Sequence, residues 1–139
     1  MRSAAGVLPI LSISPRDADH EALDGIFHGA AGWSLHRCSS PDAALPVILG
    51  HGIPVVLCAS DPGSCTWQEV LENLQRLPDP PFFILTTPDA DGGMWAEALN
   101  LGAYDVLVQP FDPREVIHRI TAAWSRWSDQ RAAPLTCKS

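Results

Sequence analysis

Short apolar runs alternate with segments of helical periodicity along the chain. In two of these runs, 54–60 and 82–87, apolar residues follow one another without alternation, which is typical of strands buried on both faces of a parallel sheet. The run 33–38 instead alternates, with Trp33 and Leu35 on the face opposite His36, and predicts a half-buried strand. The predicted strands cover residues 6–14, 33–38, 54–60, 82–87 and 104–108.

A segment with helical periodicity follows each predicted strand. The clearest is 66–77, whose apolar stripe includes Trp67 and in which Thr66 and Glu69 have the spacing of a capping box. We expect Gly102 to end the fourth helix, because glycine readily adopts the left-handed conformation found after helix C-termini. The predicted helices cover residues 17–29, 40–50, 66–77, 94–102 and 114–127.

Proline marks the second of these helices as unusual. Ser40 and Pro41 are typical of an N-cap and of the first helical position. Pro46 then falls inside the segment, where it removes a backbone hydrogen bond, so we expect a short or kinked helix.

Five strands, each followed by a helix, predict an α/β fold of three layers, with a parallel sheet between two layers of helices. The flavodoxin-like strand order 2-1-3-4-5 is the common solution for a (βα)5 chain. We therefore expect one domain over residues 6–127. Residues 1–5 and 128–139 are expected to be short tails, the second of them frayed.

Composition and charge narrow the possible partners. The chain has 139 residues, a formal net charge of −7 and a sequence pI of about 5.0, which disfavours nucleic-acid binding. No apolar run approaches the ~20 residues that a membrane-spanning helix needs. Ser12 and Ser14 interrupt the apolar stretch near the N-terminus, which argues against a signal peptide. A cytoplasmic protein is expected.

The cysteines and histidines do not predict a metal site. The four cysteines form no C-x-x-C pair, and we expect reduced thiols. His36 and Cys38 share one face of a predicted strand, but two ligands do not make a zinc site. Cys58 lies in an apolar run and is expected to be buried and inert, whereas a redox role for Cys65 stays open.

The segment LGAYDVLVQPFDPREVIHRI at 101–120 resembles the last third of response regulator receiver domains (CheY-like), in which L-G-A and a strand precede Lys-Pro-Phe and a final helix. The resemblance extends back through PVVLCAS, WQEVLENL and a threonine in the fourth strand. It implies two-component (phosphorelay) signal transduction. In this family a histidine kinase phosphorylates an aspartate at the end of strand three, beside two Mg²⁺-binding acids, a Ser/Thr and a lysine.

The residues that would perform this chemistry differ here. The two acid positions fall at Ser14 and Pro15, the phospho-acceptor position at Ala59, and the lysine position at Gln109. An acyl phosphate among carboxylates needs a cation to neutralise the cluster, so the joint loss of acids and lysine is self-consistent. The resemblance therefore implies a degenerate receiver, or pseudo-receiver, that lacks the usual Mg²⁺ site and any cofactor.

The residues of the conformational switch also differ. The switch-aromatic position falls at Val106, with Tyr104 nearby, and the strand-four hydroxyl at Thr86 or Thr87. We expect a protein without enzymatic activity that acts through a protein partner in a signalling pathway, independently of phosphorylation.

Two alternatives to a phosphorylation-independent interaction module remain open. Asp61 lies two residues beyond Ala59 and could accept a phosphoryl group, although Asp-Pro-Gly is typical of a turn whose aspartate bonds local backbone. Asp17 and Asp19 could rebuild a metal site, although acids are common at helix N-termini. A flavodoxin-like domain that binds a small ligand is the second alternative.

Three aromatic residues are candidate interface residues: Trp95, Tyr104 and Trp127. Large rigid aromatic side chains are enriched in protein interfaces. The resemblance implies contacts, including homodimers, through the face formed by helix four, strand five and helix five. Neither nucleic acid nor a membrane is expected as a partner.

Overall fold

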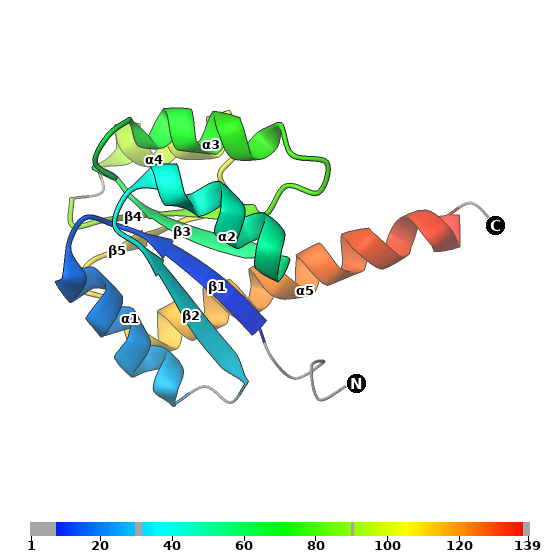
Figure 1. Ribbon diagram of the computed structural model, residues 1–139, viewed down its shortest axis with the longest axis horizontal. Helices are drawn as coiled ribbons and strands as arrows, with labels where there is room; N and C mark the ends of the chain where they lie inside the picture. Colours follow the sequence, from blue (N-terminus) through cyan, green and yellow to red (C-terminus); the bar gives the residue numbers. More distant parts are fainter. Residues whose placement is uncertain (1–7, 30–31, 90, 138–139) are drawn as a thin grey trace.

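The computed structural model describes residues 8–29, 32–89 and 91–137. The expected tail at 1–5 and the first two residues of the predicted strand 6–14 lie outside the described residues. Strands and helices alternate as predicted (Figure 1). The elements are β1 (Leu8–Ile13), α1 (Asp17–His28), β2 (Trp33–Cys38), the 3₁₀ helix η2 (Pro41–Ala43), α2 (Ala44–His51), β3 (Val55–Ala59), α3 (Trp67–Gln75), β4 (Phe82–Thr87), α4 (Gly92–Leu101), β5 (Asp105–Val108) and α5 (Pro113–Cys137).

The five strands form one parallel sheet in the order β2-β1-β3-β4-β5, which confirms the predicted flavodoxin-like topology. Its register brings the ends of neighbouring strands to one edge: Ile13 pairs with Cys58, and Ala59 pairs with Thr86. The carboxyl ends of the strands therefore carry the loops in which ligands bind in sheets of this kind.

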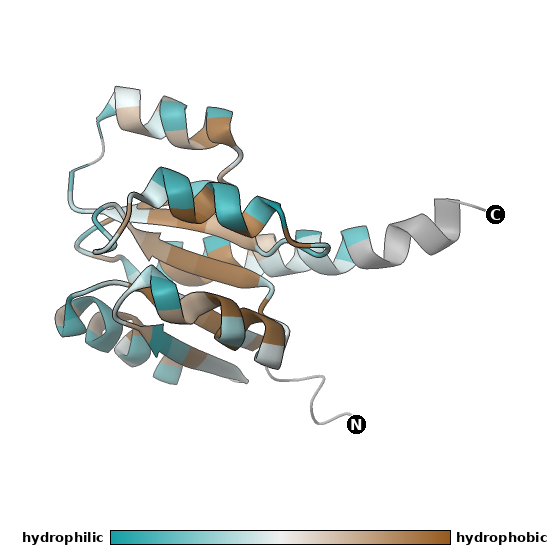
Figure 2. Ribbon diagram, turned by 45° about the horizontal axis from the view of Figure 1, so that its top comes forward, coloured by the Kyte–Doolittle hydropathy of each residue, from teal (hydrophilic) through white to brown (hydrophobic). Residues whose placement is uncertain are grey.

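Helices cover both faces of the sheet (Figure 1). Leu23 of α1 and Ile120 of α5 are buried in the cluster on one face. On the other face, Ile48 of α2, Val70 of α3 and Ala98 of α4 are buried together. Every residue of β3 is buried, as its unbroken apolar run predicts, and the strands are the most hydrophobic layer of the molecule (Figure 2).

Local signals placed several helix ends correctly. Thr66 and Glu69 form the predicted capping box at α3, and Gly102, with a φ of 112°, ends α4 as expected. The helix α4 begins at Gly92, two residues earlier than predicted, because the Asp91 carboxylate accepts a 2.7 Å hydrogen bond from the Met94 N–H.

Two predictions about helix ends need correction. The segment around Pro46 is short, as predicted, and consists of η2 and α2, but the Ser40 side chain makes no capping hydrogen bond. The helix α5 runs to Cys137, ten residues beyond the predicted end at 127, and so continues into the segment expected to be a C-terminal tail. Residues 128–133 contain no glycine or proline, which favours continuation beyond the sheet, whereas Pro134 inside the helix disfavours it, so propensity does not explain the last turn. Residues 138–139 lie outside the described residues.

None of the helices in the described ranges has both the length and the apolar character needed to cross a membrane.

Candidate functional site

The carboxyl edge of the sheet brings most of the predicted pocket positions together. Ser14 directly follows β1, Ala59 ends β3 and Gln109 directly follows β5. Ala59 is 1% exposed, and its register partner Thr86 is also buried. Because paired residues of neighbouring parallel strands point to the same face, Thr86 is the threonine beside Ala59.

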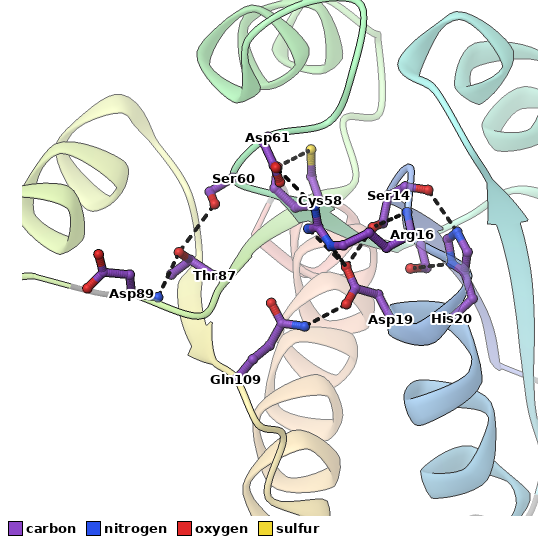
Figure 3. Close-up of polar contacts among 12 residues, drawn as sticks. Ser14, Arg16, Asp19, His20, Cys58, Ser60, Asp61, Thr87, Asp89 and Gln109 are labelled. Atoms are coloured by element: carbon purple, nitrogen blue, oxygen red, sulfur yellow. Dashed lines mark hydrogen bonds and ion pairs between the residues drawn. The ribbon is translucent and has the colours of Figure 1, made fainter.

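Asp19, in the first turn of α1, is the centre of the pocket's polar contacts (Figure 3). Its Oδ2 accepts hydrogen bonds from Ser14 Oγ at 2.6 Å and from Arg16 Nε at 3.2 Å. Its Oδ1 accepts from Gln109 Nε2 at 2.8 Å. The residues at the first expected acid position and at the expected lysine position therefore both donate to one carboxylate.

Arg16 joins this cluster to the loop after β3. Its Nη2 lies 3.1 Å from Asp19 Oδ2, and its Nη1 lies 2.9 Å from Asp61 Oδ2 (Figure 3). The bond to Asp61, followed by the charge of Asp19, raises the pKa of Arg16 although burial opposes the shift. The guanidinium is thus a fixed positive charge between two carboxylates.

The ionisation of Asp19 follows from these contacts. Burial alone raises the pKa of its carboxyl, but the hydrogen bonds from Ser14 and Gln109 and the charge of Arg16 together outweigh burial. The net effect lowers the pKa of Asp19 below its ordinary value. The carboxylate is therefore ionised near neutral pH and is already bound at both oxygens.

The sequence interpretation missed three features of this cluster. Asp19 does not act as an exposed helix-terminus acid, because its residue is 7% exposed and its carboxylate binds across the pocket. The Asp61 side chain bonds Arg16 rather than local backbone. The pocket also contains a cation, supplied by Arg16. The sequence did offer one sign of this cation. Arg16 is a basic residue that directly follows positions 14 and 15, where the resemblance led us to expect acids.

A buried histidine, also unforeseen, holds the end of β1. His20 is 2% exposed and lies across the last residues of that strand. Its Nε2 lies 3.0 Å from the Ser14 carbonyl oxygen and must donate, because a carbonyl only accepts; its Nδ1 lies 3.0 Å from Ser12 Oγ. The histidine therefore fixes the strand end from which Ser14 reaches Asp19.

The second threonine has a different set of contacts. Thr87 Oγ1 accepts hydrogen bonds from Ser60 Oγ and from the Asp89 N–H, both at 3.2 Å (Figure 3). Val106 is 1% exposed and belongs to the core on the α2–α3–α4 side. The residue at the expected switch-aromatic position is therefore a packed aliphatic side chain.

Mg²⁺ does not fit the side chains present. The ion prefers oxygen ligands in octahedral geometry. Both oxygens of Asp19 are bound by donors, and the Gln109 amide and Arg16 guanidinium direct N–H groups at them. Pro15 is exposed and has no side-chain oxygen. Across the described residues, no group of three or more His, Cys, Asp or Glu side chains could hold a metal ion.

The other candidate ligands and thiols do not form a reactive site either. The His36 ring packs against His51 at 4.2 Å between centroids, and burial together with that neighbour lowers the pKa of His36. Burial raises the pKa of the Cys38 and Cys58 thiols. Cys65 is half-buried, and burial and nearby acids raise its pKa too. Raised pKa values favour the unreactive thiol form.

The three candidate interface aromatics do not share one surface. Tyr104 stacks on Phe82 at 5.1 Å between centroids, and both line a groove of about 800 Å³ with Trp127 and Arg126. This groove lies at the amino ends of β4 and β5, away from the polar cluster. Trp95 lies in the first turn of α4 and packs against the core on its own side. The predicted core position of Trp67 is confirmed, since it is 4% exposed.

Comparison with known proteins places this geometry in a structural context. No protein-family model matches the sequence, and a search of curated proteins finds no match. Solved structures do match. The signal receiver domain of an HD domain-containing protein from Pseudomonas fluorescens has a TM-score of 0.78 and 22% identity, over 88% of this chain and 98% of that one.

Two further solved structures agree. A CheY-like response regulator receiver domain protein from Methanospirillum hungatei has a TM-score of 0.78 and 18% identity, over 89% of this chain and 98% of that one. A response regulator receiver domain protein from Clostridium thermocellum has a TM-score of 0.77 and 18% identity, over 86% and 96%. The chain therefore has the fold of response regulator receiver domains, as its sequence pattern predicted.

Proposed function

We propose that this protein is a pseudo-receiver of two-component signalling, a cytoplasmic module without enzymatic activity that acts through protein contacts and independently of phosphorylation. The observation that carries the proposal is which side chains lie at the carboxyl edge of the sheet and how they are bonded. Ala59 occupies the acceptor position, and the nearby carboxylate of Asp19 is already bound by Ser14, Arg16 and Gln109.

The chemistry of phosphoryl transfer supports this proposal. An aspartyl phosphate forms when a carboxylate attacks phosphorus, and the methyl group of Ala59 offers no nucleophile. The Gln109 amide is neutral and donates to Asp19, so it supplies no positive charge to phosphoryl oxygens. The donors that bind Asp19 lower the pKa of its carboxyl, and a less basic carboxylate is a weaker nucleophile toward phosphorus.

For a partner, we propose another protein of the signalling pathway, which contacts the face formed by α4, β5 and α5; a second copy of the chain is one such partner. Tyr104 and Trp127 offer large aromatic surface beside this face. Sedimentation of the purified chain at several concentrations tests the homodimer, and a mass that rises toward twice that of the chain is the expected result. A mass that stays constant at that of one chain would contradict self-association.

Exposure to a small acyl phosphate with Mg²⁺, followed by intact-mass measurement, tests phosphorylation independence. The proposal predicts no phosphoryl adduct. The Asp61→Asn variant is measured in parallel, because Asp61 is the exposed acid of the β3–α3 loop. An adduct on the wild-type chain that the variant lacks would establish Asp61 as a displaced acceptor and overturn the proposal.

A further inference from the structure

We infer that Arg16 is a permanent cation supplied by the chain itself, which partly neutralises Asp19 and Asp61 at the carboxyl edge of the sheet and thereby excludes a divalent ion from them. The inference rests on the proposed function, because it explains how a receiver fold organises this edge without metal or phosphate. It concerns Arg16, Asp19 and Asp61, which together are called the arginine cluster below.

The guanidinium lies between the two carboxylates, and all three of its nitrogens contact them. Nε and Nη2 contact Asp19 Oδ2 at 3.2 and 3.1 Å, while Nη1 contacts Asp61 Oδ2 at 2.9 Å. A divalent ion bound by both acids would compete with Arg16 for Asp19 Oδ2 and Asp61 Oδ2, and it would approach against the positive charge of Arg16. Charge and hydrogen bonding therefore both oppose the ion.

The backbone presents this arginine to the site. The N–H of Arg16 donates to Ser14 Oγ at 3.1 Å, and its carbonyl oxygen accepts from the Asp19 N–H at 3.2 Å. Ser14 Oγ itself donates to Asp19, so one hydroxyl fixes both the arginine and the acid. The starting point of the Arg16 side chain is thus set by the same residues that surround Asp19.

The arginine cluster also joins two loops that are distant in sequence. Arg16 lies between β1 and α1, and Asp61 lies 45 residues later, between β3 and α3. In the receivers that this chain resembles, a divalent ion lies among acids at this edge. Here a side chain supplies the positive charge, so the relative position of the two loops does not depend on an added ion.

Mn²⁺ titration followed by two-dimensional NMR tests this inference, because the paramagnetic ion broadens the signals of nearby amides. Wild-type protein is expected to show no saturable broadening at Asp19 and Asp61. The Arg16→Ala variant is expected to acquire saturable broadening at both positions, since its two carboxylates are left without their cation. The double variant Arg16→Ala/Asp19→Asn is expected to lose this broadening again.

Two further variants separate a local effect from a change in total charge. Arg37→Ala removes another exposed arginine that is ion-paired at 2.9 Å, to Asp24, and changes the net charge by the same amount. It should behave like the wild type. Arg16→Lys keeps the positive charge and should restore exclusion of Mn²⁺.

The outcomes distinguish this inference from the proposed function. If Arg16→Ala remains folded and shows no Mn²⁺ broadening at Asp19 and Asp61, the inference is wrong while the proposed function stands. Saturable Mn²⁺ broadening of the wild type at these residues overturns the inference as well. Phosphorylation of the wild type, by contrast, contradicts the proposed function itself.

Discussion

Two arginines in this molecule each lie between two carboxylates, in different regions. Arg119 of α5 contacts Asp105 of β5 and lies 3.2 Å from Glu115 one turn earlier in the helix. Arg16 contacts Asp19 and Asp61 at the carboxyl edge of the sheet. The side chains of Arg119 and Asp105 are 29% and 17% exposed, whereas Arg16 and Asp61 are 40% and 70% exposed.

An arginine between two carboxylates therefore has a different role in each region, according to where the fold places it. Around Arg119 the partners are close in sequence, and the contacts attach a helix to the strand that precedes it. The arginine cluster instead joins loops that only the sheet brings together. The first arrangement is expected to contribute mainly to stability, and the second mainly to the properties of the site.

The largest expected effect comes from removing Arg119. The Arg119→Met variant keeps much of the apolar stem but leaves the mostly buried Asp105 carboxylate without its cation, which should lower the free energy of unfolding by about 2 kcal/mol. Urea unfolding measures this change. Arg114→Met, on the exposed surface of the same helix, is the control and should remain close to the wild type. If both variants lost the same free energy of unfolding, Arg119 would have no special structural role.

Asp19→Asn is expected to have the next largest effect, about 1 kcal/mol, because the variant loses charge-assisted hydrogen bonds from Arg16, Ser14 and Gln109. Its pH dependence follows from the lowered pKa of Asp19. The ionised carboxylate stabilises the fold above the ordinary pKa of 3.8, and this contribution is lost as pH falls through the lower folded pKa.

The measurement for Asp19 is therefore a pair of unfolding curves, at about pH 6 and at about pH 3, for wild type and variant. Asparagine does not titrate, so the stability difference between the two proteins should shrink at the lower pH. A difference that stays constant or grows would mean that Asp19 is not a stabilising carboxylate in the folded protein.

Arg16→Ala should cost less than either of these changes, about 0.5 kcal/mol, because an ion pair between exposed side chains is screened by solvent. The loss should shrink further at high salt concentration. Thermal unfolding at low and high ionic strength measures both effects. A loss of stability as large as that of Arg119→Met would show that both arginines mainly stabilise the fold, so that the two regions would not differ in role.

The smallest expected effect is that of Asp61→Asn, whose stability should lie within about 0.3 kcal/mol of the wild type. Local opening should nevertheless increase, because the variant weakens the contact between the two loops. Hydrogen exchange of the amides around residue 61 reports this change. Unaltered exchange would indicate that Arg16 does not restrain the β3–α3 loop.

The fold was predictable because its signals are local. The Thr66–Glu69 spacing, the glycine after α4 and the unbroken apolar run of β3 each act within a few residues, and the strand–helix alternation then limits the topology. The end of α5 was missed because a segment beyond the sheet has no packing signal, and its helix propensity is mixed, with Ala132 and Ala133 followed by Pro134.

Of the site, only the strand ends around it were predictable from the sequence. Ser14, Ala59 and Gln109 lie at the carboxyl ends of β1, β3 and β5, because the strands determine where these residues lie. Their contacts were missed, since Gln109 meets Asp19 across 90 residues, and an acid at a helix start has an ordinary local explanation. Sequence spacing could not show that Arg16 would turn toward Asp61.

Whether the protein works without a phosphoryl group is tested most directly by titrating the wild-type chain with Mg²⁺ and beryllofluoride, a mimic of that group, followed by two-dimensional NMR. We expect no saturable shift changes at the carboxyl edge of the sheet, because Ala59 offers no carboxylate and Arg16 binds the nearby carboxylates of Asp19 and Asp61. Saturable shifts centred on Ala59, Asp61 and Thr86 would contradict it, since they would show that the edge still assembles a phosphoryl site.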